Sequence, residues 1–140
     1  MTTLAKVCKS DVRHSTRQGG ETRILLSPVT TKATSGFLGT LDLAPGEHVS
    51  GHYHPYSDEF LFVVRGELLV EADGQLLELT ADEALMLPRN TTHRFTNTGE
   101  KPVFVVFHIG PLAPSPELGH VETELVPRPD ALPPKVGGPR

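Results

Sequence analysis

Short apolar segments alternate with turn residues along most of the chain. The segments span residues 23–26, 37–43, 59–64, 67–71, 75–79, 84–87, 93–96 and 103–109. Asp73-Gly74 lies between two of them, and this dipeptide favours a two-residue β-hairpin turn because both central positions need positive φ. Turns that recur about every 8–12 residues, with no run of helical period, predict an all-β sandwich or barrel.

Two stretches, 60–64 and 103–107, are apolar at every position. Strands of this kind are buried on both faces. Either both faces pack inside the protein, or one face lines the barrel and the other meets a second subunit. Aromatic residues of the predicted strands are expected to make the interior apolar, among them Phe37, Phe60, Phe62, Phe95, Phe104 and Phe107.

The two ends of the chain differ from this middle part. Residues 1–22 are polar and aperiodic, and eight of the 13 prolines fall within residues 111–140. Proline lacks a backbone N–H and fixes φ, so the proline-rich part is neither central strand nor helix interior. We therefore expect an N-terminal arm over residues 1–22, one barrel with its flanking segment over residues 23–126, and a proline-rich, disordered tail over residues 127–140.

The arm and residues 111–126 carry apolar side chains that are spaced too widely to form a core of their own. These segments are expected to lie across a partner subunit or to close one end of the barrel. We therefore expect a homodimer.

Composition narrows the class of protein. The 140 residues fit one domain, and 13 Lys+Arg against 17 Asp+Glu give a formal net charge of -4. The sequence has no basic cluster suited to nucleic acid, no apolar run of about 18 residues, and a single cysteine, Cys8, which excludes an intramolecular disulfide. We expect a cytoplasmic protein that binds neither nucleic acid nor membrane.

Seven histidines are the unusual feature of the composition. His52 and His54 are one residue apart, so on a strand both imidazoles leave the same face, where they can bind one Zn, Fe, Ni or Cu ion. Glu59 begins the next strand and can return a carboxylate to the same place. A third histidine, His93, follows a turn at Pro88.

These residues fit two motifs that follow one another in the chain. The first, G-x5-H-x-H-x4-E-x6-G, is matched at Gly46, His52, His54, Glu59 and Gly66. The second, G-x5-P-x-G-x2-H-x3-N, is matched at Pro88, His93 and Asn97, with Asp82 and Asn90 in place of its glycines. In both motifs the chain resembles the cupin superfamily, over about residues 36–110. The resemblance implies a single jelly-roll barrel with a metal at the positions of His52, His54, Glu59 and His93.

The sequence positions of the other histidines allow different roles or none. His108 ends the segment 103–109 and is either a core residue or a side chain that reaches the cavity, where it could replace Glu59 as the fourth ligand. His48 would lie about 13 Å from His52 on a regular strand, which favours the barrel rim. His14 and His120 lie outside the predicted barrel and are given no role.

Three longer stretches, 35–41, 52–66 and 106–120, resemble the single-cupin aromatic polyketide cyclases of the tetracenomycin and resistomycin type. The resemblance implies a homodimeric enzyme of antibiotic biosynthesis that works beside polyketide synthase components. Such an enzyme closes rings on a hydrophobic poly-β-ketone chain by intramolecular aldol condensation and dehydration.

A metal centre is compatible with that reaction. A divalent cation polarises a ketone, acidifies the adjacent methylene and stabilises the enolate, while a neighbouring base removes the proton. We expect His52, His54 and His93 to hold the metal. Glu59 is the expected general base, or His108 if Glu59 is itself a ligand. Aldol chemistry needs no redox change, so Zn²⁺ is the expected ion, with Fe²⁺ and Ni²⁺ as alternatives.

Two other functions would use the same residues. An Fe(II)-dependent cupin dioxygenase would open a diketone or aromatic substrate at such a site. A non-catalytic small-molecule-binding cupin would use the metal only to support the fold. Activity under nitrogen would exclude the oxygenase, and product loss in a folded His54→Ala variant would exclude the binding module.

Overall fold

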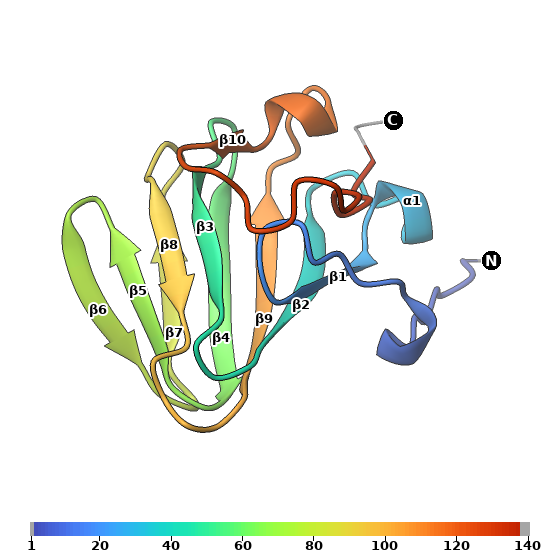
Figure 1. Ribbon diagram of the computed structural model, residues 1–140. Helices are drawn as coiled ribbons and strands as arrows, with labels where there is room; N and C mark the ends of the chain where they lie inside the picture. Colours follow the sequence, from blue (N-terminus) through green and yellow to red (C-terminus); the bar gives the residue numbers. More distant parts are fainter. Residues whose placement is uncertain (1, 138–140) are drawn as a thin grey trace.

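The computed structural model describes residues 2–137, which form two antiparallel β-sheets that face each other (Figure 1). The first sheet has the strand order β1 (Glu21–Leu26), β2 (Phe37–Leu43), β9 (Val103–Gly110), β4 (Asp58–Arg65) and β7 (Ala84–Leu87). The second has the order β10 (Val121–Glu122), β3 (His48–Tyr53), β8 (His93–Thr96), β5 (Leu68–Ala72) and β6 (Gln75–Leu79). The all-β prediction is confirmed.

Helices are few and short in the described residues. They are the α-helix α1 (Pro28–Thr31) and two 3-10 turns, Lys9–Asp11 and Pro116–Leu118. Within residues 2–137, no helix has the length and apolar character needed to cross a membrane.

The strands follow the apolar segments, each of which overlaps a strand. Asp73 and Gly74 form the turn between β5 and β6 with φ of 50° and 76°, as a two-residue hairpin requires. No apolar segment marks β3, because its buried residues include the polar side chains of Ser50 and His52.

Buried and outward side chains alternate along β4. Leu61 and Val63 point between the sheets and are buried. Phe60 and Phe62 point the other way and remain 46% and 41% exposed. For β4, the alternative in which both faces pack inside one chain is therefore wrong, because the outward residues Phe60 and Phe62 stay exposed within residues 2–137. An outer face that meets a second subunit remains a prediction.

The N-terminal arm and the C-terminal segment lie side by side at one end of the sandwich (Figure 1). The backbone N–H of Arg128 donates to the carbonyl of Arg17 (3.1 Å), and Ser15 Oγ donates to the carbonyl of Leu132 (2.6 Å). From these segments, Gln18, Leu112 and His120 line the cavity of their own barrel. Leu4, Leu118 and Leu125 are 89%, 50% and 94% exposed, and their contact with a partner subunit remains a prediction.

The tail was expected to be disordered over residues 127–140. Residues 127–137 have no helix or strand, yet Val136 packs against the hydrophobic core, and Arg17 donates to the carbonyls of Pro129 and Ala131. A proline-rich segment thus still offers carbonyls and apolar side chains to its neighbours, and disorder of the tail remains a prediction. Residues 138–140 lie outside the described residues.

Candidate metal centre

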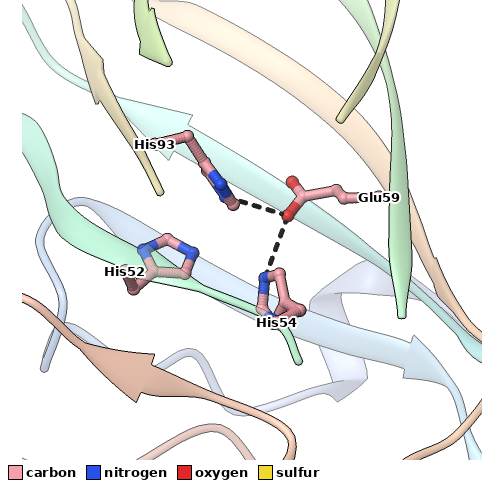
Figure 2. A group of neighbouring side chains, drawn as sticks. All are labelled: His52, His54, Glu59 and His93. Carbon is pink, nitrogen blue, oxygen red and sulfur yellow. Dashed lines mark hydrogen bonds and ion pairs between the residues drawn. The ribbon is translucent and has the colours of Figure 1, made fainter. Parts of the chain in front are cut away.

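Four side chains converge between the two sheets: His52, His54, Glu59 and His93 (Figure 2). One nitrogen of each imidazole and one carboxylate oxygen all lie within 4.8 Å of one another. All four residues are buried. Imidazole nitrogens and a carboxylate at such distances form a donor set typical of transition-metal sites.

Strand pairing brings these residues together. In the antiparallel pair of β3 and β8, His52 lies opposite His93, and their ring centroids are 4.3 Å apart. His54 follows β3 by one residue, and Glu59 is the second residue of β4 in the other sheet. The cluster therefore bridges the two sheets, and both sequence motifs contribute to it.

The turn of the second motif also fixes His54. Asn90 stands where the motif has glycine and adopts a positive φ of 68°, a conformation that asparagine tolerates better than most residues. Its backbone N–H donates to the carbonyl of His54 (2.9 Å). Asp82, the other departure from the motif, has a φ of 73°. Both departures therefore keep the backbone that glycine would supply.

Each imidazole of the cluster is oriented through its Nδ1 atom. All three Nδ1 atoms lie next to a backbone carbonyl oxygen: His52 by Ser50 (2.8 Å), His54 by Gly119 (2.9 Å) and His93 by Thr91 (2.9 Å). A carbonyl only accepts, so Nδ1 carries a proton and donates it. In the neutral ring Nε2 then keeps its lone pair, which is the form in which histidine binds a metal.

Glu59 Oε1 faces two of these nitrogen atoms. It lies 3.1 Å from His54 Nε2 and 3.3 Å from His93 Nε2. Among the described residues, His93 Nε2 is buried without a hydrogen bond of good geometry. A carboxylate that faces nitrogen lone pairs in a buried place requires a proton or a cation between them. The residues present therefore fit a divalent metal ion.

The pKa values of the cluster follow from this arrangement. Burial alone would raise the pKa of Glu59, but His54 and His93 outweigh it and hold that pKa well below its usual range. Burial alone would lower the pKa of His93, but the Glu59 carboxylate beside it raises that pKa instead. Burial, reinforced by the surrounding imidazoles, lowers the pKa of His52 well below its usual value. Metal binding would displace the proton that Glu59 favours on His93.

Residues 39–109 match the family model described as "Cupin domain". The chain belongs to the cupin family. The two facing sheets and both histidine-bearing motifs fall largely within this match, so the jelly-roll barrel inferred from the motifs is confirmed.

Two relatives of this cupin are named as polyketide synthase proteins. It is 56% identical over 134 residues to the tetracenomycin polyketide synthase protein TcmJ of Streptomyces glaucescens, covering 96% of this chain and 90% of TcmJ. It is 51% identical over 114 residues to the polyketide synthase CurC of Streptomyces cyaneus, covering 81% of this chain and 74% of CurC. The predicted family resemblance is confirmed.

A solved structure supports the fold of the cupin. The polyketide cyclase RemF of Streptomyces resistomycificus matches it with a TM-score of 0.70 at 18% identity, covering 91% of this chain and 90% of RemF. At that identity the match concerns the fold alone.

The structure does not bring His108 to the cluster, and this corrects its predicted place as a fourth ligand or base. Residues of β9 alternate between the two faces of the sheet, and His108 lies opposite the outward residue Phe60, with ring centroids 6.2 Å apart. Its neighbour Ile109 is the residue opposite Glu59. Strand parity therefore places His108 on the outer face. His48 is half-buried at the start of β3, four residues before His52.

His120, to which the sequence assigned no role, lies beside the cluster. Its ring stacks on His52, with centroids 4.3 Å apart and planes at 19°. Burial, assisted by the nearby His54, lowers the pKa of His120 to about 3. No local pattern marks this residue, because its place depends on the return of the chain that pairs β10 with β3.

The cluster faces a cavity of about 460 Å³. Its wall is mainly apolar, and includes Phe37, Leu41, Phe95, Phe107 and Ile109. The arm and the C-terminal segment complete it with Gln18, His120, Pro134 and Val136. Phe60 and Phe62, expected inside, instead point outward. Phe104 lies beneath Lys9 and Arg65 and is not part of the wall.

Proposed function

We propose that the protein is a metal-dependent cyclase that closes rings on the poly-β-ketone chain of an aromatic polyketide in antibiotic biosynthesis. The reaction is an intramolecular aldol condensation followed by dehydration. One observation carries the proposal: three imidazole nitrogens and a carboxylate converge beside an apolar cavity.

The proposed metal ligands are His52, His54, His93 and Glu59, and the proposed ion is zinc. A donor set rich in imidazole favours zinc, iron or nickel over magnesium or calcium. Zinc suffices because aldol chemistry needs no redox change, and Fe²⁺ and Ni²⁺ are the alternatives. When bound, such an ion supplies Lewis-acid chemistry at a ketone oxygen.

The relatives support a polyketide substrate, since two of them are named as polyketide synthase proteins. The apolar wall of the cavity also suits a hydrophobic substrate that carries carbonyl groups. A wall of fixed shape would hold the chain folded so that one carbon meets the correct carbonyl. Orientation of this kind supplies a large part of the rate enhancement in intramolecular reactions.

The two oxygens of Glu59 have separate roles in the proposal. Oε1 faces His54 and His93, whereas Oε2 makes no hydrogen bond within the described residues. Oε2 can therefore accept a proton from the substrate methylene while Oε1 stays with the metal ligands. His108 has no part in the proposal, because it lies on the outer face of the sheet.

We also propose that the protein is a cytoplasmic homodimer that works beside polyketide synthase components. The outer face of β4 and β7 supports the dimer, since Phe60, Phe62 and Met86 are 46%, 41% and 46% exposed there. Neighbouring large apolar side chains on a surface are typical of protein interfaces. The proposed occupant of this face is a second copy of the chain.

The test is reconstitution with a polyketide synthase that releases an uncyclised poly-β-ketone. Zinc-loaded wild-type protein should shift the products, measured by mass spectrometry, toward a defined cyclised aromatic compound. The His54→Ala variant should lose this shift while it retains the circular dichroism spectrum of a folded protein. The matched variant His14→Ala changes an exposed histidine of the arm and should keep the shift.

Three results would contradict the proposal. Products that stay the same with and without wild-type protein would exclude a cyclase. A product shift that requires oxygen and disappears under nitrogen would favour an Fe(II)-dependent dioxygenase. A His54→Ala variant with lower thermal stability but unchanged products would favour a binding protein in which the metal only supports the fold.

A further inference from the structure

A polar group distinct from the proposed metal ligands faces the same cavity. It consists of Gln18 from the arm and of His120 and Glu122 from the C-terminal segment. The His120 ring stacks on His52 at 4.3 Å between centroids and lies 5.4 Å from the ring of His54. A ligand that reaches the metal cluster from the cavity therefore lies close to His120.

Hydrogen bonds fix the tautomer of His120. Its Nε2 lies 2.9 Å from Glu122 Oε1, and a carboxylate only accepts, so Nε2 carries the proton and Nδ1 keeps a lone pair. The side-chain nitrogen of Gln18 lies 2.9 Å from the same Nε2 and 3.4 Å from Nδ1. With the proton on Nε2, the Gln18 amide can donate only to Nδ1, and a hydrogen bond of 3.4 Å is long and weak. A ligand oxygen can therefore replace this weak contact and bond to Nδ1 or to the Gln18 amide.

Two other polar side chains of the wall are already engaged with the backbone. Ser57 Oγ donates to the carbonyl of Pro111, and Arg17 donates to the carbonyls of Pro129 and Ala131. The pair of Gln18 and His120 differs because its contact at Nδ1 is long and it faces a mainly apolar cavity.

We propose that His120 and Gln18 together bind the polyketide oxygen that follows, along the chain, the oxygens at the metal cluster. Nδ1 of His120 accepts from an enol hydroxyl, and the Gln18 amide donates to a ketone oxygen. A poly-β-ketone carries an oxygen on every second carbon, so holding one of them at His120 selects which carbonyl lies at the metal cluster. This inference rests on the proposed function and adds the residue that determines which ring closes.

Two small probes separate these contacts. Pentane-2,4-dione has two oxygens for the metal cluster, whereas heptane-2,4,6-trione has one more that can reach His120. In titration calorimetry, zinc-loaded wild-type protein should bind the trione about fivefold to tenfold more tightly than the dione, as one hydrogen bond would give. In His120→Phe, which keeps an aromatic ring against His52, this preference should disappear while dione affinity and zinc content stay the same.

Two further variants complete the experiment. Gln18→Leu should reduce the preference without changing the ring on His52, and His14→Phe, in the exposed part of the arm, should keep it in full. An unchanged preference in both His120→Phe and Gln18→Leu overturns the inference and leaves the cyclase proposal standing. Zinc loss in His120→Phe with a full preference in Gln18→Leu also overturns it, because His120 would then serve the metal. If wild-type protein binds neither probe, the inference and the proposed function both fail.

Discussion

His54 Nε2 lies 3.1 Å from Glu59 Oε1, while Nδ1 of the same ring donates to the carbonyl of Gly119 at 2.9 Å. A neutral imidazole has a single N–H group, and in His54 this is Nδ1–H, which donates to the Gly119 carbonyl. The lone pair of Nε2 therefore faces the Glu59 carboxylate. Such a contact inside a protein requires added positive charge between the two groups. A divalent ion shared with His52 and His93 would supply that charge.

Metal affinity should therefore depend on His54. Loss of a hydrogen bond that only orients a metal ligand lowers metal affinity by about 10- to 100-fold. His54→Ala removes a ligand itself, so we expect it to lower zinc affinity by at least about 100-fold. Competition with a chromophoric chelator measures this. His108→Ala is the matched control, and it should bind zinc as the wild type does because His108 lies on the outer face. Equal affinities for wild type and His54→Ala would contradict the assignment.

The loop that follows β8 depends on Asn97, whose side chain is fully buried. Its amide donates to the carbonyls of Leu43 (3.0 Å) and Lys101 (2.8 Å) and accepts from the N–H of Gly99 (3.0 Å). Asn97→Ala leaves these groups unpaired and should lower the free energy of unfolding by about 2–3 kcal/mol. Urea unfolding measures this, and Thr98→Ala, at an exposed neighbouring position, should change it by less than about 0.5 kcal/mol.

Acid should destabilise the metal-free protein through its buried neutral histidines. Burial lowers the pKa of His120 from 6.5 to about 3, so folding favours its neutral form. The contribution of His120 to the free energy of unfolding is fully present above pH 6.5 and is lost as the pH falls from 6.5 toward 3. The free energy of unfolding in chelator should thus fall by up to about 1.4 kcal/mol per pH unit for this group, and the pKa of His52 is shifted in the same direction. His120→Phe should flatten the slope between pH 6 and 4 by about one proton, and equal slopes would contradict the shift.

The exposed face of β4 should govern association. Phe62→Lys places a charge in the proposed interface and should convert a dimer of about 30 kDa into a monomer of 15.2 kDa, measured by light scattering after gel filtration. Leu76→Lys on β6 is the control, because Leu76 is 70% exposed on the other sheet. A wild-type monomer at micromolar concentration would contradict the proposed dimer.

Much of the fold could be predicted because burial of one face leaves an apolar pattern and turns need particular residues. Asp73-Gly74 marks its hairpin for that reason. Strand β3 leaves no such pattern, since Ser50 and His52 occupy buried positions in place of apolar residues. The path of residues 127–137 could not be predicted either, because it depends on carbonyl contacts with the distant Arg17.

The candidate site also contains residues that the sequence predicts and residues that it does not. Motif spacing identifies His52, His54 and His93, because ligands on paired strands need a fixed separation. His108 could not be placed from a segment that is apolar on both faces, since only the register between β9 and β4 decides which way it points. His120 enters the cavity through a long-range pairing that no local pattern encodes.

The most direct test of the metal centre is anomalous X-ray diffraction from crystals of zinc-loaded protein, recorded on both sides of the zinc absorption edge. We expect one strong anomalous peak per chain, about 2.0–2.1 Å from Nε2 of His52, His54 and His93, with a Glu59 oxygen beside it. An absence of any peak among these side chains, or a zinc ion bound elsewhere while they keep their metal-free positions, would contradict the account.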